Sequence, residues 1–224
     1  MLNFPREESD AENEVGGTAD LKEKIYAADS EVLREIGNIG MGHAATSLAQ
    51  MLNRRIDMTP PVVSFFSKKE FADTILLTQS EDFLCYQISL QGNAEGRIIH
   101  MFGEHFALSA INMFFGGGLT NLTETDDMTR SVIQEITNIT SGSYCNALAA
   151  MTGEFIDIST PTFREDAECA LGETAELFSD NILTIDSHFL IDGNKKERSR
   201  FLFFPDGDTA YMLYKKLKEH FKIG

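Results

Sequence analysis

The sequence predicts a mixed α/β fold built from one unit that occurs twice in the chain. Twelve of the thirty-one positions from 31 to 61 are identical to the positions 100 residues further on. Each copy is followed by the same order of helical and extended segments. A hydrophobic content of 42%, with seventeen Phe among 224 residues, is enough for a substantial core. Self-similarity at a fixed offset indicates duplicated architecture, so we expect the two halves to share one fold.

The first half begins with a predicted long helix over 21–53. Val32, Ile36 and Ile39 are spaced as i, i+4 and i+7, which is the core stripe of an amphipathic helix, and Asn53 is a suitable C-cap. Pro61 then opens a strand over 62–66, where no backbone donor is required of it. The other predicted elements of this half are strands over 83–90 and 97–102, a helix over about 105–115, and a short helix or loop over 67–77.

The second half repeats this order. Its predicted elements are a helix over about 126–151, a strand after Pro161, strands over 182–191 and 200–204, and a helix over 208–222. The halves differ between their first two strands, where residues 166–178 have the length and composition of a three-turn helix. This asymmetric insertion is a candidate partner-binding site.

Composition and charge limit the class of protein. Residues 1–20 contain six acids and one Arg and predict a disordered acidic tail. Residues 21–224 predict a single domain with repeats over about 28–118 and 126–222. There is no secretory signal and no apolar run near the roughly 18 residues of a membrane span, so we expect a cytoplasmic protein without membrane insertion. The net charge of −16 argues against nucleic acid and favours a partner with basic surface groups.

Several catalytic chemistries are not indicated. Cys85, Cys145 and Cys169 are too few and too dispersed for a zinc site, and we expect them to be buried thiols. None of them is followed six residues later by Arg, so a cysteine-phosphatase loop is absent, and the chain has no P-loop. The five His do not have metal-ligand spacing. We therefore expect no metal site and no cofactor of the protein's own.

The repeat also duplicates a polar pair. On a helix, Glu31, Glu35 and Asn38 form a stripe with Gly42 beside the apolar stripe. The second copy has the same stripe, made of Ser131, Glu135, Asn138 and Gly142. Asn is a mediocre helix former, so helix propensity does not explain its position inside both helices. Arg34 and Gln134, at neighbouring surface-like positions, differ while the Glu–Asn pair does not.

The chemistry of this pair requires a second protein. A carboxamide donates and accepts hydrogen bonds at once, so it can orient a water for in-line attack on phosphorus. A nearby carboxylate can pair with a Lys of a partner. Neither group is a covalent nucleophile, so we expect the pair to complete a site that belongs to another protein.

The spacing resembles a known signature. The pattern Asp/Ser-x3-Glu-x2-Asn-x22-Pro is that of the CheC/CheX/FliY phosphatases of chemotaxis. The second copy matches it in full through Ser131, Glu135, Asn138 and Pro161. The first copy matches at Glu35, Asn38 and Pro61 and has Glu31 where Asp or Ser is usual. The resemblance extends from about residue 28 to 222.

This resemblance implies a fold and an activity. The implied fold is a pseudo-two-fold α/β domain whose central antiparallel six-stranded sheet is flanked by helices, with the two motif helices side by side. The implied activity is hydrolysis of the aspartyl phosphate of a CheY-type response regulator. Asn38 or Asn138 then orients the water, and Glu35 or Glu135 contacts the regulator's lysine. Glu31 and Ser131 have supporting roles, Pro61 and Pro161 are structural, and the Mg²⁺ belongs to the regulator.

Two motifs in one unit resemble CheC more than the shorter CheX or the FliY type, which has an added switch domain. The resemblance implies the receptor deamidase CheD as a further candidate partner, with 166–178 as the matching region. Two alternatives remain at this point. One is an adaptor that binds phosphorylated CheY or CheD without turnover, and the other is a phosphatase for a different response regulator.

Overall fold

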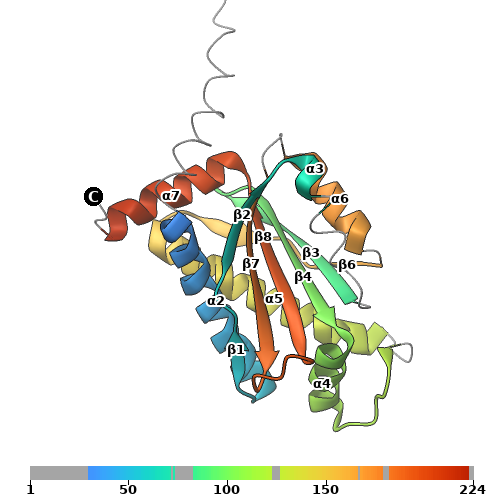
Figure 1. Cartoon of the computed structure of the whole chain (residues 1–224). Helices are drawn as coiled ribbons and strands as arrows, with labels where there is room; N and C mark the ends of the chain where they lie inside the picture. The colour runs from blue at the N-terminus through green and yellow to red at the C-terminus, as the bar shows by residue number, and fades with distance from the viewer. Residues whose placement is uncertain are drawn as a thin grey trace, which may run out of the picture.

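A computed structural model describes residues 30–71, 73, 83–122, 127–165, 167–178 and 182–221 (Figure 1). Its helices are α2 (Ser30–Leu52), α3 (Lys68–Phe71), α4 (Glu104–Phe115), α5 (Asp127–Thr152), α6 (Ala167–Leu177) and α7 (Gly207–Phe221). Its strands are β1 (Ile56–Met58), β2 (Val62–Phe66), β3 (Phe83–Gly92), β4 (Gly96–Gly103), β5 (Ile156–Ile158), β6 (Thr162–Arg164), β7 (Ile182–Ile191) and β8 (Arg198–Pro205). The predicted acidic tail lies outside the described residues.

The strands form one antiparallel sheet in which the two halves of the chain exchange their edges. The order is β1-β7-β8-β4-β3-β5, while β2 also pairs with β7 and β6 also pairs with β3. The first-half strands β1 and β2 therefore lie end to end along β7 of the second half, and β5 and β6 lie along β3 of the first half. The sheet is six positions wide, as predicted, with β4 and β8 paired at its centre.

The register shows which residues of the two halves are equivalent. Val62 pairs with Asp186, and Thr162, its copy 100 residues on, pairs with Gln87. Asp186 and Gln87 therefore occupy equivalent places. Ser89 and His188, each two residues further along, are therefore equivalent as well. Because Ser89 pairs with Arg97 and His188 pairs with Arg200, Arg97 and Arg200 are equivalent too. From β4 onwards the offset between the halves is thus 103 residues, and it also relates Glu104 at the start of α4 to Gly207 at the start of α7.

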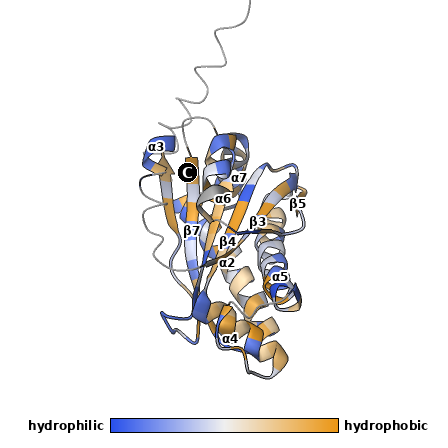
Figure 2. Ribbon diagram, turned by 90° about the vertical axis from the view of Figure 1, so that its right-hand side faces the viewer, coloured by the Kyte–Doolittle hydropathy of each residue, from blue (hydrophilic) through white to orange (hydrophobic). Residues whose placement is uncertain are grey.

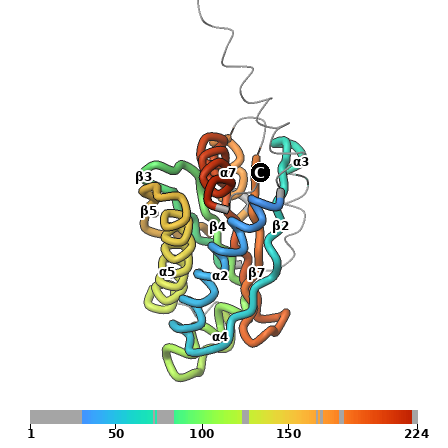
Figure 3. Tube along the Cα trace, turned by 90° about the vertical axis from the view of Figure 1, so that its left-hand side faces the viewer, coloured from blue at the N-terminus to red at the C-terminus, as the bar shows by residue number. Residues whose placement is uncertain are grey.

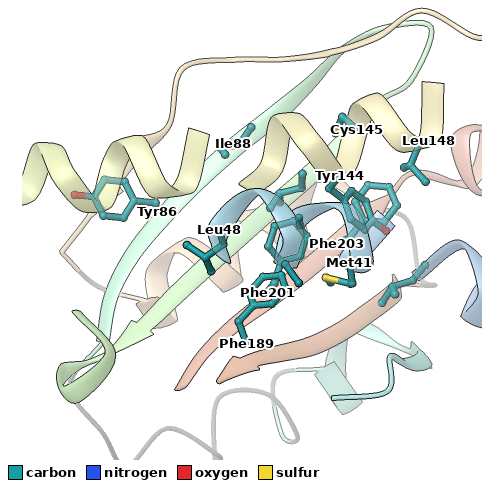
Figure 4. Packing of buried hydrophobic residues seen from close by; sticks show 14 of the residues in the cluster. Met41, Leu48, Tyr86, Ile88, Tyr144, Cys145, Leu148, Phe189, Phe201 and Phe203 are labelled. Carbon is teal, nitrogen blue, oxygen red and sulfur yellow. The ribbon is translucent and has the colours of Figure 1, made fainter. Parts of the chain in front are cut away.

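Helices cover both faces of the sheet. The main core lies between the sheet and helices α2, α4, α5 and α7. The motif helices α2 and α5 lie side by side on this face (Figure 3). A smaller core lies on the other face, where α3 and α6 pack on Phe204, Ile99 and Leu202. Figure 4 shows the main core at the helix crossing, where Tyr144 of α5 meets Phe201 and Phe203 of β8.

Where the structure describes them, the predicted elements are present with small shifts at their ends, whereas residues 21–29 of the first predicted helix and most of 72–77 lie outside the described residues. Asn53 has a positive φ of 49°, as a left-handed C-cap requires. The short strands β1 and β5 were not predicted. Each has three residues and begins a few positions after the end of a helix, and three residues are too few for an alternating pattern to stand out.

The two motif helices approach closely where one side chain is missing. A Cβ added to Gly40 would lie 2.5 Å from Cε2 of Tyr144, whose side chain is fully buried. The equivalent positions in the other half hold Thr140 and Ala44, so the combination of glycine and tyrosine occurs at only one of the two equivalent places. Gly42, by contrast, has no atom within 4 Å of an added Cβ. Gly40 is therefore required by packing, whereas Gly42 is free of steric demand within the chain.

A buried histidine joins α5 to the centre of the sheet. His100 of β4 has no exposed surface and is surrounded by Phe102, Phe189 and Phe201. Because Thr140 Oγ1 donates to the Ile136 carbonyl oxygen, the ring Nδ1–H is the donor to Thr140 Oγ1 at 3.5 Å. Nε2 then accepts from Ser199 Oγ at 3.0 Å. Burial lowers the pKa of His100 to about 3, so the ring is neutral in the folded protein.

We predict opposite effects on stability for alanine at the two neighbouring glycines of α2. Gly40→Ala should destabilise the fold by about 1–3 kcal/mol, because its Cβ would overlap the Tyr144 ring. Gly42→Ala should stabilise it by about 0.5–1 kcal/mol, because Ala is the better helix former and meets no neighbour. Urea unfolding of both variants measures the difference, and equal effects would contradict the packing argument.

His100 should make stability depend on pH. Its folded-state pKa of about 3 lies below the unfolded value of about 6.5, so its contribution is complete above pH 6.5 and is lost as the pH falls toward 3. Between pH 6.5 and pH 5 this loss amounts to about 2 kcal/mol. His100→Phe, which copies the equivalent Phe203, should reduce that slope in urea unfolding. His43→Gln, at an exposed position, should retain it, and equal slopes in all three proteins would refute the assignment.

Candidate functional site

The first Glu–Asn pair lies on the outer side of α2. Val32 and Ile36 are buried against the sheet, whereas Glu31 and Glu35 are exposed and Asn38 is partly exposed. The Asn38 side chain donates from Nδ2 to Glu35 Oε2 at 3.4 Å. The acid and the amide are therefore adjacent on an open surface, as the spacing predicts.

The second pair occupies the same position on α5. Ser131, Glu135 and Asn138 are exposed, and Ile136 beneath them is fully buried. Ser131 Oγ donates to the Asp127 carbonyl oxygen at 2.7 Å, within the first turn of the helix. In the part of the chain that the structure describes, Glu135 and Asn138 make no side-chain hydrogen bond, so both are available to a partner.

The two pairs lie on neighbouring helices on one side of the protein. Ser143 Oγ of α5 donates to Ser47 Oγ of α2 at 2.7 Å where the helices cross. In Figure 3 both helices face the viewer, and the sheet lies behind them. The structure thus brings the two predicted sites onto one continuous helical surface.

Pro61 and Pro161 are buried beneath the motif helices and do not face the solvent. A Cβ added to Gly37 of α2 would lie 2.8 Å from Pro61 Cβ and 2.8 Å from Ile185 Cγ2. In the other half the side-chain amide of Gln134 donates to the Pro161 carbonyl oxygen at 3.0 Å. Each proline therefore supports the helix segment that presents a Glu–Asn pair, and the two halves achieve this differently.

Sequence reasoning did not identify Gly37 or Gln134. The sequence predicts a surface position for Gln134, but this residue is half-buried and hydrogen-bonded to the loop before β6, whereas its copy Arg34 is exposed. The signal available in the sequence was the difference between Arg34 and Gln134 at equivalent positions of the two halves. The structure separates these supporting residues from the exposed acid and amide.

The site has no chemistry of its own beyond hydrogen bonding and charge. Among the described residues, no group of three or more His, Cys, Asp or Glu could hold a metal ion. Cys85 and Cys145 are buried, as predicted, and burial raises the pKa of Cys145 to about 12. The side chain of Cys169 lies outside the described residues. No described helix has the length and apolarity of a membrane span.

Fold and site together define a duplicated α/β protein that presents two exposed Glu–Asn pairs on adjacent helices. The model of the CheC-like family matches residues 30–65 and 128–165, which are the two motif segments. The CheY-P phosphatase CheC of Bacillus subtilis is 29% identical over 199 residues, covering 85% of this chain and 94% of that protein. The chain therefore resembles the CheC-like family in both motif segments and CheC over most of its length.

Two further proteins are similar to this chain, the second of them in fold alone. The flagellar motor switch phosphatase FliY of Bacillus subtilis is 26% identical over 155 residues, which cover 66% of this chain and 40% of that protein. The crystal structure of Thermotoga maritima FliY has the same fold, with a TM-score of 0.66, 22% identity, and coverage of 90% of this chain and 97% of that one.

The two supports beneath the sites lead to a prediction at equivalent positions. Gln134→Ala should destabilise the protein by about 1 kcal/mol, because it removes a half-buried hydrogen bond to the Pro161 carbonyl oxygen. Arg34→Ala should change stability by less than about 0.5 kcal/mol, since Arg34 is exposed. Chemical denaturation of the two variants tests this, and an equal change in both would remove the proposed role of Gln134.

Proposed function

We propose that this protein dephosphorylates the aspartyl phosphate of a CheY-type response regulator, with Asn38 and Asn138 as the water-orienting residues of two sites. The observation behind the proposal is the Glu–Asn pair, which occurs twice on one helical surface. Neither pair contains a covalent nucleophile, and no group of described residues could hold a metal ion. The relation to a protein named CheY-P phosphatase supports the substrate class.

The hydrolysis needs little covalent chemistry from this chain. The Asn carboxamide accepts a hydrogen bond from the attacking water through Oδ1 and holds it in line with the scissile bond. The water oxygen bonds to phosphorus while the bond from phosphorus to the aspartyl oxygen breaks. The aspartate leaves as a carboxylate, and the water's proton passes to phosphate or solvent. The Mg²⁺ in this scheme belongs to the regulator, and this chain supplies no cofactor.

Glu35 and Glu135 act in this scheme by positioning the regulator. Each is exposed one turn before its Asn and can pair with the lysine of the regulator's phosphorylation site. Glu31 and Ser131 lie one turn earlier and support the same contact. In the first site the bond between Asn38 and Glu35 must open or shift before both groups can engage a partner.

We also propose a cellular location, domain bounds and a further partner. The location is the cytoplasm, where a soluble regulator is the substrate. The domain extends from about residue 21 to 224 as one unit of two repeats, preceded by the acidic segment 1–20. CheD is a further candidate partner, and α6, at the asymmetric insertion, is the candidate surface for it.

Removal of both amides should abolish acceleration. Purified protein mixed with phosphorylated CheY and Mg²⁺ should speed phosphate release, and Asn38→Ala with Asn138→Ala should reduce that acceleration by a factor of at least about 100, because positioning of the nucleophile is lost. Binding to CheY should remain, since the Glu residues are intact. The measurement is a time course of phosphate release together with a binding titration.

The control is Asn146→Ala, an exposed asparagine of α5 outside both pairs, which should leave phosphate release unchanged. Unaltered release in the double variant would eliminate the mechanism. A wild-type protein that binds phosphorylated CheY without accelerating hydrolysis would instead establish the alternative function, an adaptor.

A further inference from the structure

Three exposed apolar side chains lie on α4 and on the first turn of α5, the helix that carries the second site. Seven large hydrophobic residues of the described chain are exposed, and three of them belong to the end of α4 and the start of α5: Phe114 at 45%, Phe115 at 44% and Met128 at 65%. We call these three residues the apolar patch. Figure 2 shows the strongly hydrophobic colouring of α4 below the first turns of α5.

Met128 continues the stripe of the second site by one turn. It precedes Ser131 by three residues and Glu135 by seven, so it lies on the same side of α5. At a rise of about 1.5 Å per residue, Met128 and Asn138 are about 15 Å apart. An interface of standard size covers about 800 Å² on each partner, a disc of roughly 16 Å radius. A protein docked on Asn138 therefore reaches Met128.

Direct contacts tie α4 to the same end of α5. The Tyr86 hydroxyl donates to the Arg130 carbonyl oxygen of α5 at 2.9 Å, and the Tyr86 ring contacts Phe102. Phe102 in turn contacts Phe106 of α4, with 5.6 Å between ring centroids. The first turn of α4 and the start of α5 are thus held together through a buried aromatic chain, and Phe114 and Phe115 lie two turns further along the same α4 helix.

The exposure of the two Phe rings is a defined feature of the fold. After α4 the chain turns back, and Asn112 fixes it through two hydrogen bonds to the Leu119 backbone, each 2.9 Å long. Leu119 and Leu122 pack on the main core, yet Phe114 and Phe115 stay exposed. The described part of this connection, up to Leu122, is thus fixed to Asn112 and the main core, and the two Phe rings remain available to a partner.

The other half differs at the same place. At the offset of 103 residues, Leu217 and Lys218 of α7 are equivalent to Phe114 and Phe115. Leu217 is fully buried, and Lys218 is a cation directed toward Tyr214. The apolar patch therefore belongs to the second site alone among the described residues.

We propose that the apolar patch is a docking surface for the phosphorylated regulator that binds Glu135 and Asn138, and that it makes the second site the tighter of the two. This inference rests on the proposed function. The occupant follows from continuity with the Glu135–Asn138 stripe, because one partner covers both. Met adapts to differently shaped apolar surfaces, and buried aromatic groups commonly dominate binding energy.

The duplication supplies the test. Asn38→Ala leaves only the second site intact, and Asn138→Ala leaves only the first. Met128→Ser should raise the KM for phosphorylated CheY by about 5- to 20-fold in the Asn38→Ala background. It should leave kcat there unchanged and alter neither constant in the Asn138→Ala background. Titration with CheY carrying beryllofluoride, a stable mimic of aspartyl phosphate, should show the same loss as a rise in Kd.

Two further variants guard against a merely structural effect. Phe115→Lys, which introduces the residue of the equivalent α7 position, should act like Met128→Ser. Leu177→Ser removes a side chain of similar exposure, 58%, from α6 on the opposite face of the sheet, and should change neither KM nor Kd. Thermal unfolding should place all three variants within a few degrees of their parents.

The outcomes separate this inference from the proposed function. If the parents accelerate phosphate release but Met128→Ser changes neither background, or changes both equally, the docking role is wrong and the phosphatase assignment stands. If no parent accelerates release, the proposed function itself fails. A wild-type dimer that dissociates on Met128→Ser in sedimentation would assign the apolar patch to a second copy of the chain and overturn the proposal.

Discussion

The exchange of edge strands between the two halves is the constraint on which the rest of the structure depends. Because β1 and β2 pair with β7 while β5 and β6 pair with β3, neither repeat has a complete sheet without the other. The same exchange places Pro61 and Pro161 beneath the motif helices. The distance of each Glu–Asn pair from the sheet is therefore set by strands whose pairing partners come from the opposite half of the chain.

Much of this fold could be predicted from the sequence, because its helices have strong apolar periodicity and its long strands are bounded by clear turns. Asn53 at a helix end and Pro61 at a strand start located boundaries through local conformational preference. The exchanged pairing could not be predicted, since a repeat at an offset of 100 residues is equally compatible with two self-contained sheets. Strand pairing depends on contacts between distant residues, and a single sequence contains no record of them.

The exposed acid and amide could also be predicted, because a helix separates an apolar stripe from the one beside it. Their supports could not, because Gly37 and Gln134 act through contacts with Pro61 and with the Pro161 carbonyl oxygen that only the folded chain creates. The half-buried ion pair of Asp186 and Arg200 is a similar case. In the first half, Gln87 occupies the place of Asp186, and Arg97 occupies the place of Arg200. The replacement of a carboxylate by an amide can be recognised only once the register shows that these positions are equivalent.

The exchanged edges also impose an order on synthesis of the chain at the ribosome. Ile56 pairs with Ile191, so β1 emerges 135 residues before the strand that completes it. At about 5–20 residues per second, the first-half edge remains without its partner for roughly 7–27 s. β6 is different, since its partner β3 has already been made when Thr162 appears. The nascent first half therefore exposes unpaired strand edges that other chains can bind, and the second half closes the sheet as it leaves the ribosome.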